Sequence, residues 1–202
     1  MIKAGPNMTM STAVAPSGGA AGVQSTIRTS WDVRPLKNET PGIQKRLCNL
    51  LNMNMEQLET IKVIRYQEGQ FFNDHFDSVT GADHDVDNRR SDRYNRIVTC
   101  FVYLTTNTEG GISQFCNLGG GVREDAARKG APLDIAPRQG MAVIHFPSFL
   151  PGAKNDLGGW ADCRVRHRGL PAKSEKFIAA QWAWNVEPHD GNAAKKCSDT
   201  VL

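Results

Sequence analysis

The chain has 202 residues, of which 40% are hydrophobic and 22% charged, a composition that excludes a disordered chain and a coiled coil and suits one ordinary domain. Its net charge of +3 is small and its lysines and arginines are scattered, so nucleic acid is not expected as a partner. No run approaches the roughly 18 apolar residues that cross a bilayer, and no signal peptide is evident, so we expect a soluble chain with no membrane span.

The two ends of the sequence differ in composition from its middle. Residues 1–24 contain a Gly-Gly-Ala-Ala-Gly stretch and several Ser, Thr and Pro but few large apolar side chains, which predicts a flexible leader. We expect one folded domain over residues 25–188, followed by a C-terminal tail over residues 189–202.

Two helices are expected before the first strand. Thr40 and Pro41 provide a helix start, and apolar residues follow at the spacing of one helical face, which predicts a helix over residues 41–51. Asn54 and Gln57 form a capping-box pattern for a second, shorter helix near residues 55–60.

Short segments rich in apolar and β-branched residues follow the helices. Loops rich in turn residues separate these segments, and no helical crossovers lie between them. Helices followed by many strands predict a mainly β sandwich or barrel with helices on one side. The long loops, residues 78–95 and 117–139, are expected to be functional or mobile. The expected strands cover residues 61–66, 97–104, 141–146 and 177–184.

A candidate metal motif, His75-Phe76-Asp77, follows the first expected strand. The period of two along a strand places His75 and Asp77 on the same face. One imidazole and one carboxylate so placed form two thirds of a facial triad, which leaves metal positions open for a co-substrate and oxygen. Alone, a His-x-Asp sequence is more often a solvated turn or a structural hydrogen bond than a metal site.

A second segment supplies the expected third ligand. His167 opens a turn, and Lys176, nine residues later, leads into the last apolar strand. A cation near the metal histidine could bind the distal carboxylate of 2-oxoglutarate while the keto acid end chelates iron. His145 lies within an apolar strand and is expected to be a hydrogen-bonded core or rim histidine. His84 lies in a polar loop that lacks the ligand order of an EF-hand, so a solvated loop is expected there.

Together these segments resemble the catalytic core of the prolyl 4-hydroxylase family over roughly residues 26–186. Ser113 stands where the family usually has threonine, and Ile112 replaces a commonly acidic residue. The matching features are, in order, Arg28-Thr29-Ser30, Arg65-Tyr66, Gly69, His75-Phe76-Asp77, Tyr103-Leu104, Gly110-Gly111-x-Ser113-x-Phe115, Pro137, Gly140, Phe146-Pro147, His167-x-Gly169-x-Pro171, Lys176 and Trp182.

The resemblance implies a mainly β fold, a double-stranded β-helix or jelly roll with supporting N-terminal α-helices. It also implies that the catalytic centre uses Fe(II), 2-oxoglutarate and O2, with ascorbate as an additional cofactor. The implied substrate is proline in a proline-rich or collagen-like peptide, and succinate and CO2 are released. The implied site residues are the iron ligands His75, Asp77 and His167, the carboxylate partner Lys176, and Tyr66 and Ser113 beside it.

Two alternatives remain open on sequence alone. The same chemistry could act on a lysyl side chain, a free amino acid or a small metabolite, or the chain could be a non-catalytic jelly-roll binding module. The resemblance implies the endoplasmic reticulum or secretory pathway, with the cytoplasm as the alternative, because five cysteines without a CxxC pair fit either compartment. The sequence does not predict the disulfide pairing or the oligomeric state.

Overall fold

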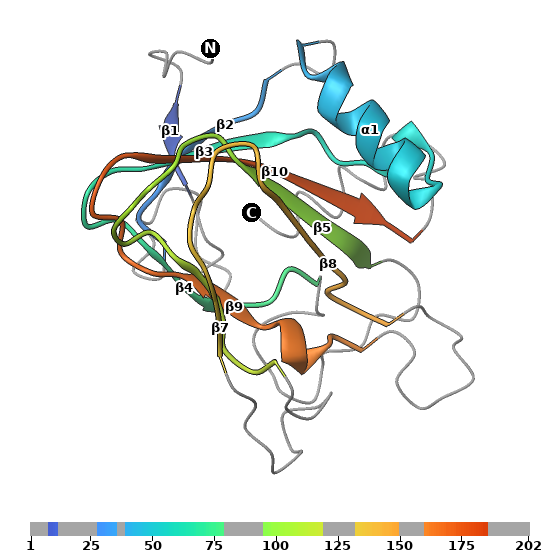
Figure 1. The fold of residues 1–202 in the computed structure, drawn as a ribbon. Coiled ribbons are helices and arrows are strands. Elements are labelled where there is room, and N and C mark those ends of the chain that lie inside the picture. The colour runs from blue at the N-terminus through green and yellow to red at the C-terminus, as the bar shows by residue number, and fades with distance from the viewer. Residues whose placement is uncertain are drawn as a thin grey trace, which may run out of the picture.

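Two antiparallel β-sheets make up most of the fold, and Figure 1 shows the larger sheet above the smaller one. The strands are β1 (Thr9–Met10), β2 (Trp31–Val33), β3 (Lys62–Tyr66), β4 (Phe72–His75), β5 (Arg96–Tyr103), β6 (Ser113–Phe115), β7 (Leu133–Ile135), β8 (Ala142–His145), β9 (His167–Gly169) and β10 (Lys176–Trp184). The larger sheet has the order β1-β2-β3-β10-β5-β8, and the smaller has the order β4-β9-β6-β7. The computed structural model describes residues 8–11, 28–35, 39–78, 95–118, 132–149 and 160–185.

Strands that are distant in the sequence lie side by side in both sheets. The last strand, β10, pairs with β3 on one side and β5 on the other, and β9 lies between β4 and β6. This is the two-sheet arrangement of a double-stranded β-helix, so the predicted fold class is confirmed.

Alternation along β5 and β10 gives the larger sheet two apolar faces. Phe101 and Trp182 are buried on the inner face, together with residues that pack against the smaller sheet. Cys100 and Ala183 are buried on the outer face, where Leu47 of the helix covers them. Both faces of β5 and β10 are therefore buried, which explains why their sequences are nearly continuous apolar runs.

One α-helix covers the outer face of the larger sheet, as Figure 1 shows. Helix α1 (Pro41–Leu51) has the predicted limits. The second expected helix is shorter than predicted, a single 3-10 turn, η2 (Met55–Gln57), although its capping box with Asn54 is present. The reason is that Leu58 is extended and forms a β-bridge with Ala183 of β10, so the chain has already joined the sheet.

Part of the expected leader joins the larger sheet. Thr9 and Met10 form β1, which pairs with Asp32 and Trp31 of β2. The expected domain limits, the loop that carries His84 and the C-terminal tail lie outside the described residues. Among the residues that are described, no helix is long and apolar enough to cross a membrane.

Two glycines with positive φ near β10 provide a test of the fold. Gly110 has a φ of +66°, and a Cβ there would lie 2.8 Å from the carbonyl oxygen of Pro171. Gly69 has a φ of +80° but would place a Cβ in open space. We expect Gly110→Ala to lower the free energy of unfolding by more than about 3 kcal/mol, because strain and a backbone clash add together. Gly69→Ala should lower it by only about 1–2 kcal/mol. Equal losses in denaturant titrations of the two variants would contradict this description of the turn.

Candidate metal and co-substrate site

The smaller sheet brings the two candidate histidine ligands together. Strands β4 and β9 pair antiparallel, and His75 lies directly opposite His167. The centroids of their rings are 4.2 Å apart. Phe72 stacks on His75 at a centroid distance of 3.6 Å, and Phe115 stacks on His167 at 5.2 Å. Strand pairing and aromatic packing therefore fix both imidazoles.

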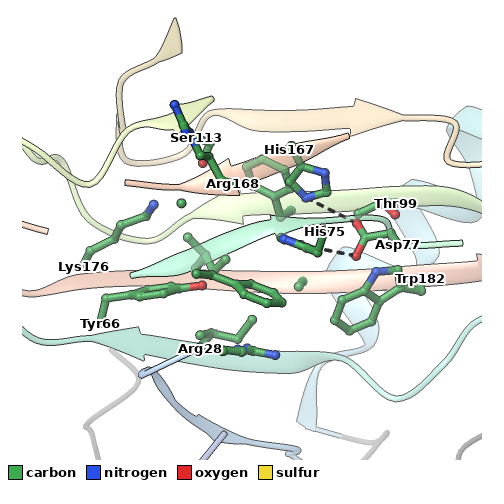
Figure 2. A pocket seen from close by; sticks show the side chains of 16 residues that line it. Arg28, Tyr66, His75, Asp77, Thr99, Ser113, His167, Arg168, Lys176 and Trp182 are labelled. Carbon is green, nitrogen blue, oxygen red and sulfur yellow. Dashed lines mark ion pairs between the residues drawn. The ribbon is translucent and has the colours of Figure 1, made fainter. Parts of the chain in front are cut away.

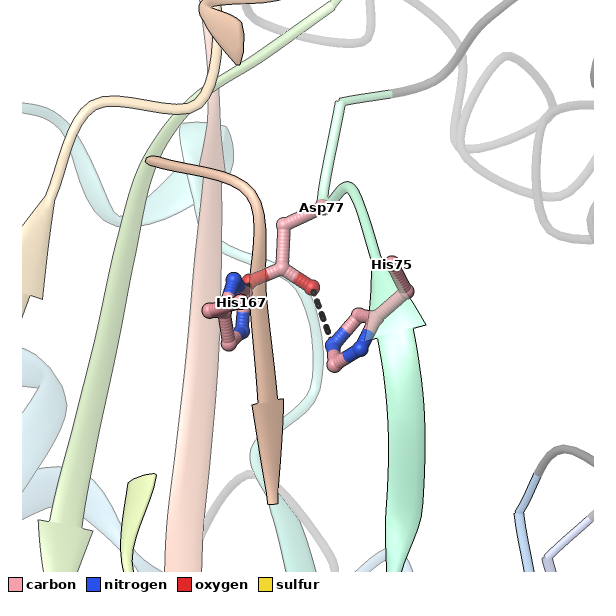
Figure 3. Close-up of side chains that lie close together, drawn as sticks. All are labelled: His75, Asp77 and His167. Atoms are coloured by element: carbon pink, nitrogen blue, oxygen red, sulfur yellow. Dashed lines mark ion pairs between the residues drawn. The ribbon is translucent and has the colours of Figure 1, made fainter. Parts of the chain in front are cut away.

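Asp77 completes the cluster from the bend that follows β4. Its Oδ1 lies 3.9 Å from Nε2 of His75, and its Oδ2 lies 3.6 Å from Nε2 of His167, as Figure 3 shows from close by. One ligand atom from each of the three residues lies within 4.8 Å of the others. The structure thus brings together the three side chains that the sequence singled out as candidate ligands.

Backbone carbonyl groups orient both imidazoles toward Asp77. Nδ1 of His75 lies 2.8 Å from the carbonyl oxygen of Asn73, and Nδ1 of His167 lies 3.0 Å from that of Val165. When Nδ1 donates its hydrogen to a carbonyl, Nε2 keeps a free lone pair that can bind a metal. The lone pair on Nε2 of each ring is therefore directed into the cluster.

The charges of the three side chains also suit a metal. Burial lowers the pKa of His75 to about 3, and repulsion from His167 acts in the same direction. Burial likewise lowers the pKa of His167. Burial alone would raise the pKa of Asp77, but His167, His145 and His75 hold it well below its ordinary value. At neutral pH the cluster therefore presents two neutral imidazoles and one carboxylate.

This set of donors fits a non-haem iron site. Two histidines and one carboxylate on one side of a metal form the facial triad of Fe(II) oxygenases, and they leave positions for further ligands. His75 and His167 are deprotonated by their surroundings, so no proton has to be displaced before a metal binds. The residues present therefore fit Fe(II).

Lys176 begins β10 at the other end of the same pocket, as Figure 2 shows. Its side chain is 3% exposed, and its Nζ donates a hydrogen bond to the carbonyl oxygen of Gly111 at 2.5 Å. Nζ also lies over the rings of Tyr66 and Tyr103, at 5.2 and 5.4 Å from their centroids.

Among the described residues no carboxylate forms an ion pair with Lys176. Burial lowers its pKa to about 8. A buried ammonium group without an anion is costly, so this end of the pocket is suited to an anionic ligand.

The two other predicted residues, Tyr66 and Ser113, line the pocket near Lys176. Tyr66 is buried, which raises the pKa of its phenol, and the nearby Ser30 and Arg28 act in the opposite direction. Ser113 is buried on β6 near Tyr103, whose hydroxyl donates a hydrogen bond to the carbonyl oxygen of Ile135. Both residues thus line the end of the pocket where an anion would sit.

Two polar residues near Asp77 are not among the site residues that the sequence predicts. Thr99 of β5 lines the pocket and lies beside Asp77 in Figure 2. His145 of β8 pairs with Thr99 in the sheet, and its Nε2 lies 3.3 Å from Oδ2 of Asp77. His145 is buried, as the sequence predicts, but its neighbour is the candidate metal ligand. The only signal in the sequence for these two residues is that each is polar and occupies an inward-facing position of an otherwise apolar strand.

Comparison with protein families gives a match over most of the described chain. The model of a family described as the 2OG-Fe(II) oxygenase superfamily matches residues 61–184. This range contains the three candidate ligands and Lys176, and it includes every strand from β3 to β10.

Curated relatives and solved structures point in the same direction. The chain is 29% identical to "Prolyl 4-hydroxylase 1" of Arabidopsis thaliana over 88% of its own length and 60% of that protein. It is 26% identical to a putative prolyl 4-hydroxylase of Acanthamoeba polyphaga mimivirus, over 80% of its own length and 60% of the relative. The chain thus spans about 60% of the length of these relatives. A crystal structure of a viral collagen prolyl hydroxylase from Paramecium Bursaria Chlorella virus-1, in complex with 2-oxoglutarate, superposes with a TM-score of 0.56 at 26% identity, covering 79% of this chain and 80% of the other.

Proposed function

The chain belongs to the 2OG-Fe(II) oxygenase superfamily, and on this premise we propose that it is a prolyl 4-hydroxylase that acts on proline-containing peptides. Membership of the superfamily implies Fe(II), 2-oxoglutarate and O2 as cofactor and co-substrates. One observation carries the proposal: a two-histidine, one-carboxylate cluster and a buried lysine without an acidic partner share one pocket.

His75, Asp77 and His167 are the proposed iron ligands. When bound, Fe(II) supplies the oxidative chemistry, in which O2 and 2-oxoglutarate yield succinate and CO2 and one oxygen atom enters a C–H bond of the substrate. The protein holds the imidazoles by strand pairing and by the carbonyl groups of Asn73 and Val165, so the ligand set is organised in advance.

Lys176 is the proposed partner of the distal carboxylate of 2-oxoglutarate. Its ammonium group would form charge-assisted hydrogen bonds with that carboxylate, and burial makes such bonds stronger than they are in water. Tyr66 and Ser113 offer neutral hydroxyl groups beside it. This anchor would fix which end of 2-oxoglutarate faces the iron ligands at the opposite end of the pocket.

Two features support proline as the substrate residue. Phe72, Phe101 and Trp182 form apolar walls of the pocket, which suit a pyrrolidine ring better than a charged side chain. The curated relatives and the viral structure all carry names of prolyl hydroxylases. A proline-rich peptide in a polyproline II conformation is already extended, so little entropy is lost when it binds.

The direct test is the dependence of succinate formation on the peptide. We expect the iron-loaded protein to form succinate faster with proline-rich or collagen-like peptides than with the same peptides carrying alanine at each proline. Mass spectrometry should show the gain of one oxygen atom on proline. Equal rates with both peptides, or an oxygen gained on lysine, would contradict the proline assignment while leaving membership of the superfamily intact.

The lowered pKa of Lys176 predicts how 2-oxoglutarate binding depends on pH. Below pH 8 the amine is charged and can pair with a carboxylate, whereas above its pKa of about 8 it loses its proton. The affinity should therefore be nearly constant below about pH 7, be about halved at pH 8 and fall by up to about tenfold per pH unit above it. Calorimetric titrations of the Mn(II)-loaded protein would measure it. The decrease should be absent in Lys176→Met, and its persistence in that variant would assign the titration to another group.

A further inference from the structure

His145 lies at the end of β8, on the side of the larger sheet that faces the pocket. It pairs directly with Thr99 of β5, which lines the pocket beside Asp77. The imidazole is 6% exposed and meets Phe115 edge to face, with centroids 5.3 Å apart. Its centroid lies 4.9 Å from that of His167. His145 therefore packs directly behind the candidate metal cluster.

The polar atoms of His145 have one evident neighbour. Nε2 lies 3.3 Å from Oδ2 of Asp77 without the geometry of a formed hydrogen bond, and within the part of the chain that the structure describes neither ring nitrogen has a hydrogen-bonding partner. A buried nitrogen without a partner lowers stability by about 1–3 kcal/mol. An apolar ring would pack against Phe115 without that loss, so packing alone does not account for a histidine at this position.

Asp77 is the ligand that most needs an external support. It follows β4 in a bend, whereas His75 and His167 lie within paired strands and have backbone partners for Nδ1. Its Oδ2 faces both His145 and His167, while Oδ1 faces His75. A carboxylate can rotate about its own axis, and it can bind a metal through one oxygen or through both. A hydrogen-bond donor held against one oxygen therefore limits the rotation and the choice between the two binding modes.

We propose that His145 is a positioning residue for Asp77, whose Nε2–H donates to Oδ2 and so restricts the carboxylate to binding the metal through one oxygen. The proposal rests on the proposed iron site. It assigns a hydrogen to Nε2 of His145. His145 does not act as a fourth ligand, because the group of atoms that could share one metal contains His75, Asp77 and His167 only, among the residues described.

Two substitutions of His145 separate a hydrogen-bond donor from a ring that only fills space. In His145→Gln the side-chain amide can still donate near the position of Nε2, whereas His145→Phe keeps the shape of the ring but has no donor. Val143→Ala is the matched control. Val143 lies two residues earlier on the same strand and face, where it packs against the inner core, and it has no polar group.

Binding of Co(II), followed by its visible spectrum, provides a measurement that does not depend on turnover. We expect His145→Phe to weaken Co(II) binding by at least about tenfold, as the loss of a hydrogen bond to a metal ligand typically does. His145→Gln and Val143→Ala should stay within about threefold of the wild type. At saturating metal, the affinity for 2-oxoglutarate should be unchanged in all three, because Lys176 is untouched. Circular dichroism would verify that each variant is folded.

The outcomes distinguish this inference from the metal site on which it rests. If the wild type binds Co(II) and His145→Phe binds it equally well, His145 does not position Asp77, while the iron site stands. If His145→Gln loses as much affinity as His145→Phe and its Co(II) spectrum changes, His145 is a ligand and the proposed role is wrong. If the wild type does not bind Co(II), both the metal site and this role are overturned.

Discussion

Replacing Asp77 with alanine should lower Fe(II) affinity by more than about 100-fold and reduce turnover to background. Loss of an outer partner of a metal ligand already costs about 10- to 100-fold in affinity, so loss of a ligand should cost more. The variant would also leave only two neutral imidazoles, without the negative charge that balances the positive charge of the metal. Fe(II) binding can be measured anaerobically by competition with a chromogenic chelator, and turnover by succinate formation.

Asp74→Ala is the matched control for this prediction. Asp74 lies on β4 next to His75, but its carboxylate interacts with Arg166, Arg168 and the thiol of Cys116. Removing it deletes a carboxylate three residues from Asp77 without touching the cluster, so Fe(II) affinity should stay within about threefold. If the two variants lose affinity equally, a general charge effect would explain the data better than ligation by Asp77.

Replacing Lys176 with methionine should weaken 2-oxoglutarate binding by about 100-fold at pH 7 and leave Fe(II) affinity within about threefold. Removing one member of a buried charge pair costs about 2–5 kcal/mol, and 2.7 kcal/mol corresponds to about 100-fold. Methionine has nearly the volume of lysine, and it removes a buried cation that has no acidic partner among the described residues. The melting temperature should therefore not fall.

Lys173→Met provides the comparison for Lys176→Met. Lys173 is exposed and lies three residues earlier in the same connection, so its replacement should leave the affinity for 2-oxoglutarate unchanged. Titration of the metal-loaded proteins with 2-oxoglutarate would give all three dissociation constants. A Lys176→Met variant that binds 2-oxoglutarate as tightly as the wild type would remove the proposed anchor and leave the metal site in place.

The elements that the sequence predicted correctly are those whose local pattern is strong. Pro41 and the apolar face that follows it determine α1, and the long apolar runs became β3, β5, β8 and β10. The short strands β4, β6, β7 and β9 were not predicted, because each has only three or four residues and few large apolar side chains, which is too little to form a strand pattern in the sequence. They are strands because neighbouring strands complete their hydrogen bonds, which is a property of the tertiary structure.

The candidate site was predictable in its members but not in its geometry. The spacing of His75 and Asp77, together with the family resemblance, named the same cluster that the fold assembles. That His75 would lie opposite His167 depends on β4 pairing with β9, and no local pattern specifies the pairing of two such short strands. The place of His145 beside Asp77 depends likewise on the order of β5 and β8 in the other sheet.

The proposed iron and 2-oxoglutarate site is tested most directly by adding both to the protein without oxygen. If His75, Asp77 and His167 hold Fe(II) and leave positions for the keto acid end of 2-oxoglutarate, a weak visible charge-transfer absorption should appear. It should saturate at one 2-oxoglutarate per chain. If no such absorption appears when iron and 2-oxoglutarate are both in large excess over the folded protein, the chain does not assemble this centre.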